Sequence, residues 1–169
     1  MHRLKHSYLT ESTPQASTRA TESTLHASAR ATESTFQTSA RTYFVDRKDK
    51  MTYEVEYTDE FEQWYVTLDA KTQARIDGLV KLLEQIGPNL GSPFSSDIKG
   101  SRHPHIRELR IQHKGEPYRI LYAFDPRRVA ILLLGGNKKG NDRWYEENVP
   151  KADKLYDELL QELDDEGLI

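Results

Sequence analysis

The amino-acid sequence predicts a small α+β domain in which two helices precede a three-stranded antiparallel meander and one helix follows it. Two observations support this class. Apolar residues keep helical spacing before residue 87 and again after residue 151, and three short apolar runs separated by turn signals lie between residues 106 and 134. The chain has 169 residues, enough for one domain and an additional segment. The predicted order is β-α-α-β-β-β-α.

The first strand and helix lie close together. Apolar and acidic residues alternate over 53–57, the pattern of a half-buried strand. Thr58 and Asp59 are residue types suited to the N-cap of a helix, and aromatic residues at helical spacing continue that helix to Leu68.

The second helix is predicted to begin after Asp69, which is its expected N-cap. Gly87 and Pro88 are expected to end it, and a polar loop follows from residue 89 to about residue 98. The apolar positions of this helix are Ile76, Leu79, Val80, Leu83 and Ile86.

The strands of the meander are predicted over 106–112, 118–124 and 129–134. The third is apolar enough to be the central strand of the sheet, and the glycines at 135–136 are expected to end it. Leucines and alanine at helical spacing predict a last helix over 152–163. The short connections make the three strands antiparallel neighbours, so we expect a small antiparallel sheet.

The first fifty residues consist largely of a repeat. Three units of eleven residues run from Glu11 to Tyr43, with Glu, Ser-Thr and Arg at fixed positions. Their apolar content is too low to form a core, which predicts a disordered low-complexity tail over 1–50. The tail has eight Lys and Arg against five Asp and Glu, so it is either an arm that binds RNA or a partner, or a translated repeat upstream of a true start at Met51. We favour the second interpretation, which makes 51–169 the working domain.

The composition excludes several classes of protein. The chain has no cysteine, so disulfides, thiolate metal sites and a cysteine nucleophile are excluded. No apolar run approaches the roughly 20 residues of a membrane span, and the N-terminus lacks the apolar stretch of a secretory signal. We therefore expect a cytoplasmic protein without a membrane partner.

Charge is unevenly distributed along the domain. From Lys99 to Lys139 there are ten Lys and Arg against three Asp and Glu, a net charge of +7. The rest of the domain has six basic and nineteen acidic residues. A basic strand face can hold a phosphate backbone, and it can equally be a solvated face paired with acidic helices. Charge alone does not separate these alternatives.

Individual residues favour nucleic acid. Arg119 lies inside an apolar strand, where a charged side chain needs a partner or a function. Lys138 and Lys139 follow the most apolar strand, and Trp144 and Tyr145 come soon after. RNA-binding sites combine such cations with aromatic rings that stack on bases. For one of the two aromatic residues we expect core packing instead.

Three motifs in this order resemble the RelE/ParE superfamily of toxins, in particular its HigB-like, phage-derived branch. They are Ile106-Arg-Glu-Leu-Arg110, Pro117-Tyr-Arg-Ile-Leu-Tyr122 and Asn137-Lys-Lys139. The resemblance covers roughly 53–163 and not the tail. It implies a RelE-like fold and the toxin of a type II toxin–antitoxin system, with a cognate antitoxin protein as partner.

The resemblance leaves three activities open. RelE-like and HigB-like members cleave mRNA in the ribosomal A site, so mRNA on the ribosome is the expected substrate. ParE-like members inhibit DNA gyrase without nuclease activity. An inactive relic that only binds antitoxin is the third alternative.

The resemblance also implies the site. The catalytic residues carried over are Arg119, Lys139, Tyr145 and His105. His103 or His105 could supply the base, as histidines do in HigB-like enzymes. Glu108 departs from the RelE pattern, since it stands where those enzymes have a lysine. The implied RNA-binding residues are Lys99, Arg102, His103, Arg107, Arg110, Lys138, Arg143 and Trp144.

The chemistry expected is metal-free RNA cleavage by the 2′-hydroxyl, which needs a base, a cation for the phosphorane charge and an acid. Tyr145 would act as the base if neighbouring cations lowered its pKa. Arg119 would stabilise the transition state, and Lys139 would hold phosphate. No cofactor is expected, and neither the carboxylates nor the pair His103 and His105 predict a metal site.

Overall fold

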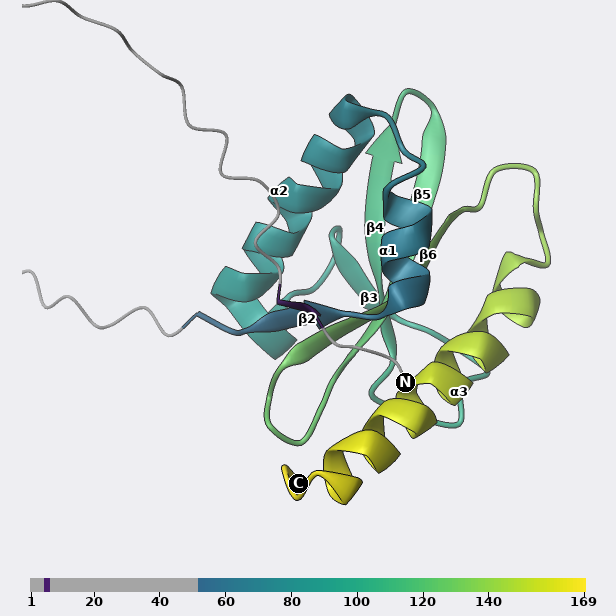
Figure 1. Cartoon of the computed structure of the whole chain (residues 1–169). Helices are drawn as coiled ribbons and strands as arrows, with labels where there is room; N and C mark the ends of the chain where they lie inside the picture. Colours follow the sequence, from purple (N-terminus) through teal and green to yellow (C-terminus); the bar gives the residue numbers. More distant parts are fainter. Residues whose placement is uncertain (1–4, 7–51) are drawn as a thin grey trace, which may run out of the picture. The chain divides into compact units, whose positions relative to one another are not determined.

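The computed structural model describes residues 5–6 and 52–169, and in these residues a mixed sheet lies between helices on both faces (Figure 1). The helices are α1 (Asp59–Tyr65), α2 (Ala70–Ile86) and α3 (Trp144–Asp165), with a 3₁₀ turn η1 (Gly87–Asn89) after α2. The strands are β1 (Lys5–His6), β2 (Val55–Tyr57), β3 (Ser95–Asp97), β4 (Arg107–His113), β5 (Glu116–Phe124) and β6 (Ala130–Asn137).

The predicted α+β class and the central position of the most apolar strand are confirmed, and the predicted elements occur in the expected order with two further strands, β1 and β3. Neighbouring strands follow the order β1-β2-β6-β5-β4-β3, and β4, β5 and β6 form the antiparallel meander. The sheet is not wholly antiparallel, because β2 runs parallel to β6, with Val55 opposite Ala130. A parallel neighbour requires a long connection, and the helices and meander between β2 and β6 supply it.

One strand lies where the sequence predicts only a polar loop. β3 pairs antiparallel with β4, with Ser96 opposite Glu108. The hydroxyl of the buried Ser95 shares a 2.8 Å hydrogen bond with the Tyr122 hydroxyl, which satisfies both polar groups inside the protein. The sequence of β3, Ser-Ser-Asp, has no apolar residue, so no apolar pattern predicts this strand.

The expected helix caps are present. The Thr58 hydroxyl accepts a hydrogen bond from the Phe61 amide, and it donates to the Leu133 carbonyl, which ties α1 to β6. The Asp69 carboxylate accepts from Lys71 and Thr72. The hydrogen bonds from Thr72 lower the pKa of Asp69 to about 2.

Several boundaries differ from the predicted ones; α1, for example, ends at Tyr65 rather than at Leu68. β6 does not end at Gly135 and Gly136 but continues to Asn137. These glycines make room for packing, because a Cβ at Gly135 would overlap the Trp64 ring and one at Gly136 would lie 2.7 Å from Trp144 Nε1. α3 begins at Trp144 rather than near residue 152, and its polar first turns and internal Pro150 conceal it in the sequence.

The sheet is buried on both faces. The α1/α2 face packs side chains such as Phe61, Leu83 and Leu109, and the α3 face packs side chains such as Leu121 and Leu159. This places alternate residues of β4 and β5 in different cores.

The predicted disordered tail over 1–50 lies outside the described residues except at Lys5 and His6. These two form β1 and pair antiparallel with β2. None of the helices within 52–169 is long and apolar enough to cross a membrane.

Candidate functional site

Three charged side chains meet on the α3 face of the sheet, beside the start of α3. Arg110 of β4 lies directly opposite Arg119 of β5, and Glu108 precedes Arg110 by two residues. Residues two apart in a strand share a face, and Leu121, two residues from Arg119, packs in the α3 core. The strand register therefore brings two guanidinium groups and a carboxylate together.

Glu108 is the centre of this group. Its side chain is only 3% exposed. Its Oε1 accepts hydrogen bonds from Ser96 Oγ at 2.9 Å and from Arg110 Nε at 2.8 Å. Its Oε2 accepts one from the Tyr145 hydroxyl at 2.6 Å and lies 3.6 Å from Arg119 Nε. The buried carboxylate is thus compensated by two cations and two hydroxyl donors.

A hollow of about 270 Å³ opens at this cluster, and we call it the Glu108 hollow. Lys138 adds a further cation at its border, since its Nζ lies 4.9 Å from the centroid of the Tyr145 ring. The residues that line the hollow are Asp97, Ile98, Lys99, Glu108, Arg110 and Tyr145.

The pKa of Tyr145 is raised, and this corrects the prediction that cations lower it. Burial of the phenol is the main cause, and the hydrogen bond and negative charge of Glu108 add to it. Arg119 opposes the shift but does not outweigh it. Glu108 also raises the pKa of Arg110. Tyr145 is therefore a protonated hydrogen-bond donor at neutral pH.

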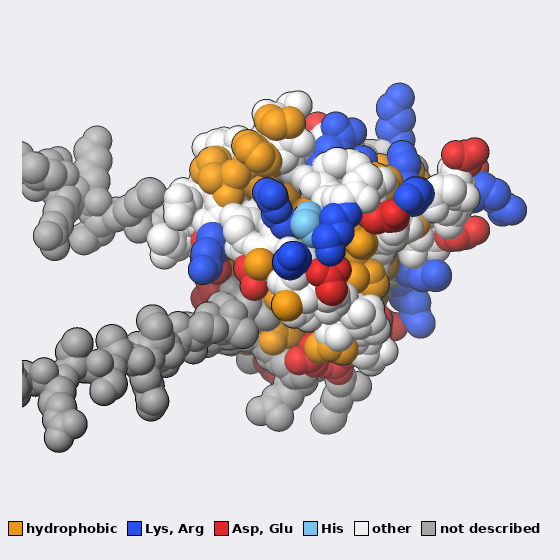
Figure 2. All heavy atoms as spheres, turned by 90° about the horizontal axis from the view of Figure 1, so that it is seen from above, with side chains coloured by type: hydrophobic (Ala, Val, Ile, Leu, Met, Phe, Trp, Pro, Cys, Tyr) orange, Lys and Arg blue, Asp and Glu red, His pale blue; other side chains and the backbone are white. Residues whose placement is uncertain are grey.

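Five of the predicted site residues are brought together by the fold, namely Lys99, Arg110, Arg119, Lys138 and Tyr145. Figure 2 shows Lys and Arg side chains on the face seen from above, with acidic and apolar side chains interspersed among them. The proximity of these residues agrees with the site expected from the motifs, while their roles stay predictions.

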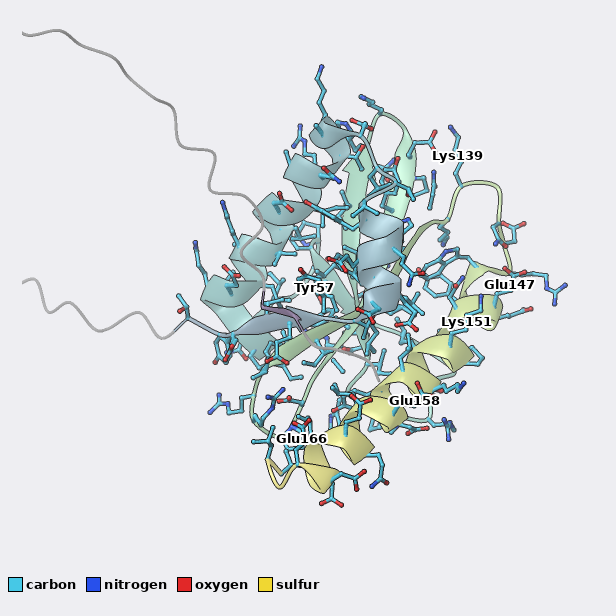
Figure 3. The ribbon with its side chains drawn as sticks, in the orientation of Figure 1. Tyr57, Lys139, Glu147, Lys151, Glu158 and Glu166 are labelled. Atoms are coloured by element: carbon cyan, nitrogen blue, oxygen red, sulfur yellow. The ribbon has the colours of Figure 1, made fainter. Side chains whose placement is uncertain are left out.

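Lys139 lies outside the hollow. Its Nζ pairs with Glu116 Oε1 at 2.5 Å, and Asn137 donates to the other oxygen of the same carboxylate. The bond from Lys139 is the main reason why the pKa of Glu116 is lowered. Figure 3 shows Lys139 projecting outward from the loop after β6. Lys138, rather than Lys139, contacts Tyr145.

The loop before β4 is fastened to α3. Arg102 and His103 both pair with Asp157 at 2.6 Å, and these two partners lower the pKa of Asp157. The buried Asp153 accepts a hydrogen bond from the Arg102 amide. His105 in the same loop is exposed and lines none of the described hollows.

Three other predicted RNA-binding residues are separate from the hollow. Arg107 lies on the α1/α2 side of β4, where it donates to the Leu90 carbonyl. Arg143 is exposed at the start of α3 and pairs with Glu146. Trp144 is 3% exposed in the α3 core, so it cannot stack on a base as placed. The expectation that one of the two aromatic residues packs in the core fits this position.

Sequence reasoning missed the central role of Glu108 and the contribution of Ser96. A signal was available for Glu108, which is one of only three acids among the thirteen charged residues from Lys99 to Lys139. Ser96 carries no signal of its own, because its contact depends on the pairing of β3 with β4. Within 52–169 the structure places no three acidic or histidine side chains as a metal-binding group.

Comparison with known proteins places the domain in a family. A family model described as "Phage derived protein Gp49-like (DUF891)" matches residues 63–157, which contain every residue of the Glu108 hollow. The chain is 45% identical over 102 residues to "Putative toxin HigB3" of Mycobacterium tuberculosis, across 60% of this chain and 88% of that protein. It is 38% identical over 109 residues to "Putative toxin HigB2" of the same organism, across 63% of this chain and 54% of that protein.

Proposed function

The chain belongs to the Gp49-like family of phage-derived proteins, and from this premise we propose that it is the toxin of a type II toxin–antitoxin system that cleaves mRNA on the ribosome. Its partners are then a cognate antitoxin protein and translated mRNA. The observation that carries the proposal is the convergence of Arg110, Arg119, Tyr145 and Glu108 at one hollow with lysines at its border. The names of the two relatives as toxins support the same reading.

The two arginines are suited to a scissile phosphate. Attack of the 2′-hydroxyl on phosphorus forms a dianionic phosphorane, and guanidinium groups stabilise its equatorial oxygens. Arg119 is fixed by burial, so it does not need to reorganise as charge develops. Arg110 is 44% exposed and can turn toward an entering phosphate.

Tyr145 and Glu108 together can accept the proton of the 2′-hydroxyl. The phenol oxygen takes this proton while the phenol's own proton passes along the 2.6 Å hydrogen bond to Glu108. Because the carboxylate accepts the phenol proton, Tyr145 can act as the base even though its pKa is raised. No phenolate has to form before the reaction. His105, the alternative base, has no comparable partner among the described residues.

The 5′-oxygen leaves as the bond to phosphorus breaks, and a 2′,3′-cyclic phosphate remains. An ammonium at the border of the hollow, on Lys99 or Lys138, donates the proton that the leaving oxygen needs. The other ammonium holds the adjoining phosphate by charge. The step requires no oxidant, reductant or cofactor.

The test uses the full-length chain on programmed ribosomes, with mRNA cleavage read by primer extension. Arg119→Ala and Tyr145→Phe are each expected to lower the cleavage rate at least about a hundredfold, the usual size of a lost transition-state contact. Tyr118→Phe is the matched control for the phenol, since Tyr118 packs on the opposite face of the sheet. Lys154→Ala on the exposed side of α3 is the control for charge.

Cleavage that survives both site variants would overturn the proposed site. Inhibition of DNA supercoiling by gyrase, with no RNA cleavage by the wild-type chain, would select the rival activity. Growth that continues normally when the wild-type chain is induced would favour the inactive antitoxin-binding relic.

A further inference from the structure

The loop that links β3 to β4, residues 98–106, takes part in two places of the structure. Near its start, Lys99 lines the Glu108 hollow. Directly afterwards, residues 101–103 are bonded to α3. Gly100 lies between these two places and has a φ of 87°, a left-handed conformation that glycine adopts without strain. The chain therefore turns from the hollow straight into its attachment on α3.

Asp153 of α3 is the centre of this attachment, and it is only 3% exposed. Its Oδ1 accepts a hydrogen bond of 2.5 Å from the Ser101 hydroxyl, and its Oδ2 accepts one of 3.0 Å from the Arg102 amide. One carboxylate thus fixes two consecutive residues of the loop. Asp157 pairs with Arg102 and His103 at 2.6 Å, but its side chain is 43% exposed. We call these contacts the loop anchor.

The loop anchor is polar although apolar contacts could retain the loop equally well. Burial of a carboxylate costs hydration, and well-packed apolar side chains often stabilise such a place as much or more. The same loop already has apolar contacts, since Ile106 is buried in the α3 core and Ile98 packs against that core. Hydrogen bonds add direction, because both oxygens of Asp153 must meet their donors at once. The loop anchor is therefore suited to fixing the position of the loop, beyond merely retaining it.

The helix that carries Asp153 also carries a residue of the proposed site. Tyr145 lies in the first turn of α3 and donates to Glu108. Asp153 follows it after eight residues, which is about 12 Å along the helix axis. Lys99 therefore reaches the hollow from a loop that is bonded to the same helix as the phenol. Lys99 itself is exposed and forms no ion pair with another described residue, so its own side chain does not hold it there.

We propose that Asp153 is a positioning residue of the candidate site, which holds the loop through Ser101 and Arg102 and thereby places the Lys99 ammonium at the Glu108 hollow. Asp153 does not contact RNA and acts only through Lys99. The inference rests on the proposed nuclease function for the use of Lys99, which is one of the two ammonium groups assigned to the reaction. The placement of Lys99 is measured without RNA, so the two proposals are tested separately.

The first experiment measures the position of the loop. The full-length chain has no cysteine, so Lys99→Cys supplies a single attachment point for a nitroxide spin label. Asp153→Asn and Ser101→Ala each remove a hydrogen bond of the loop anchor, and each is expected to shorten the rotational correlation time of the label at least about twofold. A label on Lys154→Cys, on the exposed side of α3, is the matched control and is expected to keep its spectrum.

The second experiment measures kcat/KM for mRNA cleavage on programmed ribosomes. Asp153→Asn and Ser101→Ala are each expected to lower it about tenfold to a hundredfold, as a displaced group does, and Lys99→Ala by a similar factor. Either variant combined with Lys99→Ala should lose nothing further, because the residue through which Asp153 acts is then absent. Ser101→Thr keeps the hydroxyl and should retain activity. Asp164→Asn, an exposed carboxylate on the same helix, is the matched control.

Urea unfolding curves show which variants are folded under the assay conditions, and Ser101→Ala carries the test if Asp153→Asn is not. Unchanged mobility of the label at position 99 in the folded variants would overturn the proposal. Losses of activity that add to the loss in Lys99→Ala would also overturn it, because Asp153 would then act by stability or by another route. A label that loosens at position 99 in a chain that cleaves no mRNA would uphold the positioning role while the proposed nuclease function fails.

Discussion

The ion pair between Glu108 and Arg119 offers a sharp test of how the site is held. Glu108→Gln removes the negative charge but keeps the size of a side chain that is only 3% exposed, and it leaves Arg119, 14% exposed, without its counter-charge. Breaking a buried pair from one side costs about 3–5 kcal/mol. Because Arg119 Nε and Glu108 Oε2 are 3.6 Å apart, we expect a loss slightly below this range, about 2–3 kcal/mol of unfolding free energy.

A double-mutant cycle separates this pair from its surroundings. Glu108→Gln, Arg119→Gln and the double variant are unfolded with urea as full-length chains, and the coupling free energy is expected to be about 1–2 kcal/mol. Arg110→Gln is the matched control, since Arg110 is 44% exposed and its pair is expected to contribute about 0–1 kcal/mol. A coupling free energy below about 0.5 kcal/mol between Glu108 and Arg119 would refute the reasoning.

Three further outcomes are expected. The raised pKa of Tyr145 means that the folded state retains the phenol proton above the ordinary value of 10.0, so its contribution to stability is present below pH 10 and is lost as the pH rises further. The ultraviolet difference titration between wild type and Tyr145→Phe checks this, and ionisation below pH 10 would contradict it. Gly136→Ala is expected to lower stability by about 1–3 kcal/mol, because its Cβ would lie 2.7 Å from Trp144 Nε1, and an unchanged melting temperature would count against that packing. Asp153→Ala is expected to cost about 2–4 kcal/mol in urea unfolding, through two hydrogen bonds from the loop before β4. The more exposed Asp157 should cost less when changed to Ala, and the reverse order would refute this account of the loop.

Local signals in the sequence located most elements of the fold. Asp69 and Thr58 are cap residues whose capping hydrogen bonds reach only a few positions along the chain, so their capping role can be predicted from short patterns. Gly135 and Gly136 misled the same reasoning, because their small size makes room for the rings of Trp64 and Trp144, which reach them only in the folded protein. The parallel pairing of β2 with β6 likewise depends on residues more than seventy positions apart. Such information is tertiary, and no local pattern contains it.

The sequence identified the basic residues of the candidate site but not the contacts that these residues make with one another. Arg119 stands out because it interrupts an apolar strand, and Tyr145 because it follows a basic turn. The sequence does not show which of Lys138 and Lys139 contacts Tyr145, since both follow the same strand. Only the packing decides that Lys138 lies over the Tyr145 ring. The burial of Glu108 could not be predicted either, because three of its four contacts come from other segments of the chain.

Glu108 affects both how the arginines of the site are held and how Tyr145 could act. Two guanidinium groups on neighbouring strands repel each other, and a buried carboxylate between them lets both remain close together in the folded protein. The same carboxylate raises the pKa of Tyr145, which argues against a phenolate base, and at 2.6 Å it can receive the phenol proton, which provides another route to the same chemistry. A single acid in a basic segment can therefore hold the cations in place, and in the proposed mechanism it also accepts the proton of Tyr145. For that reason the departure at Glu108 from the lysine of RelE-like enzymes is compatible with an active site.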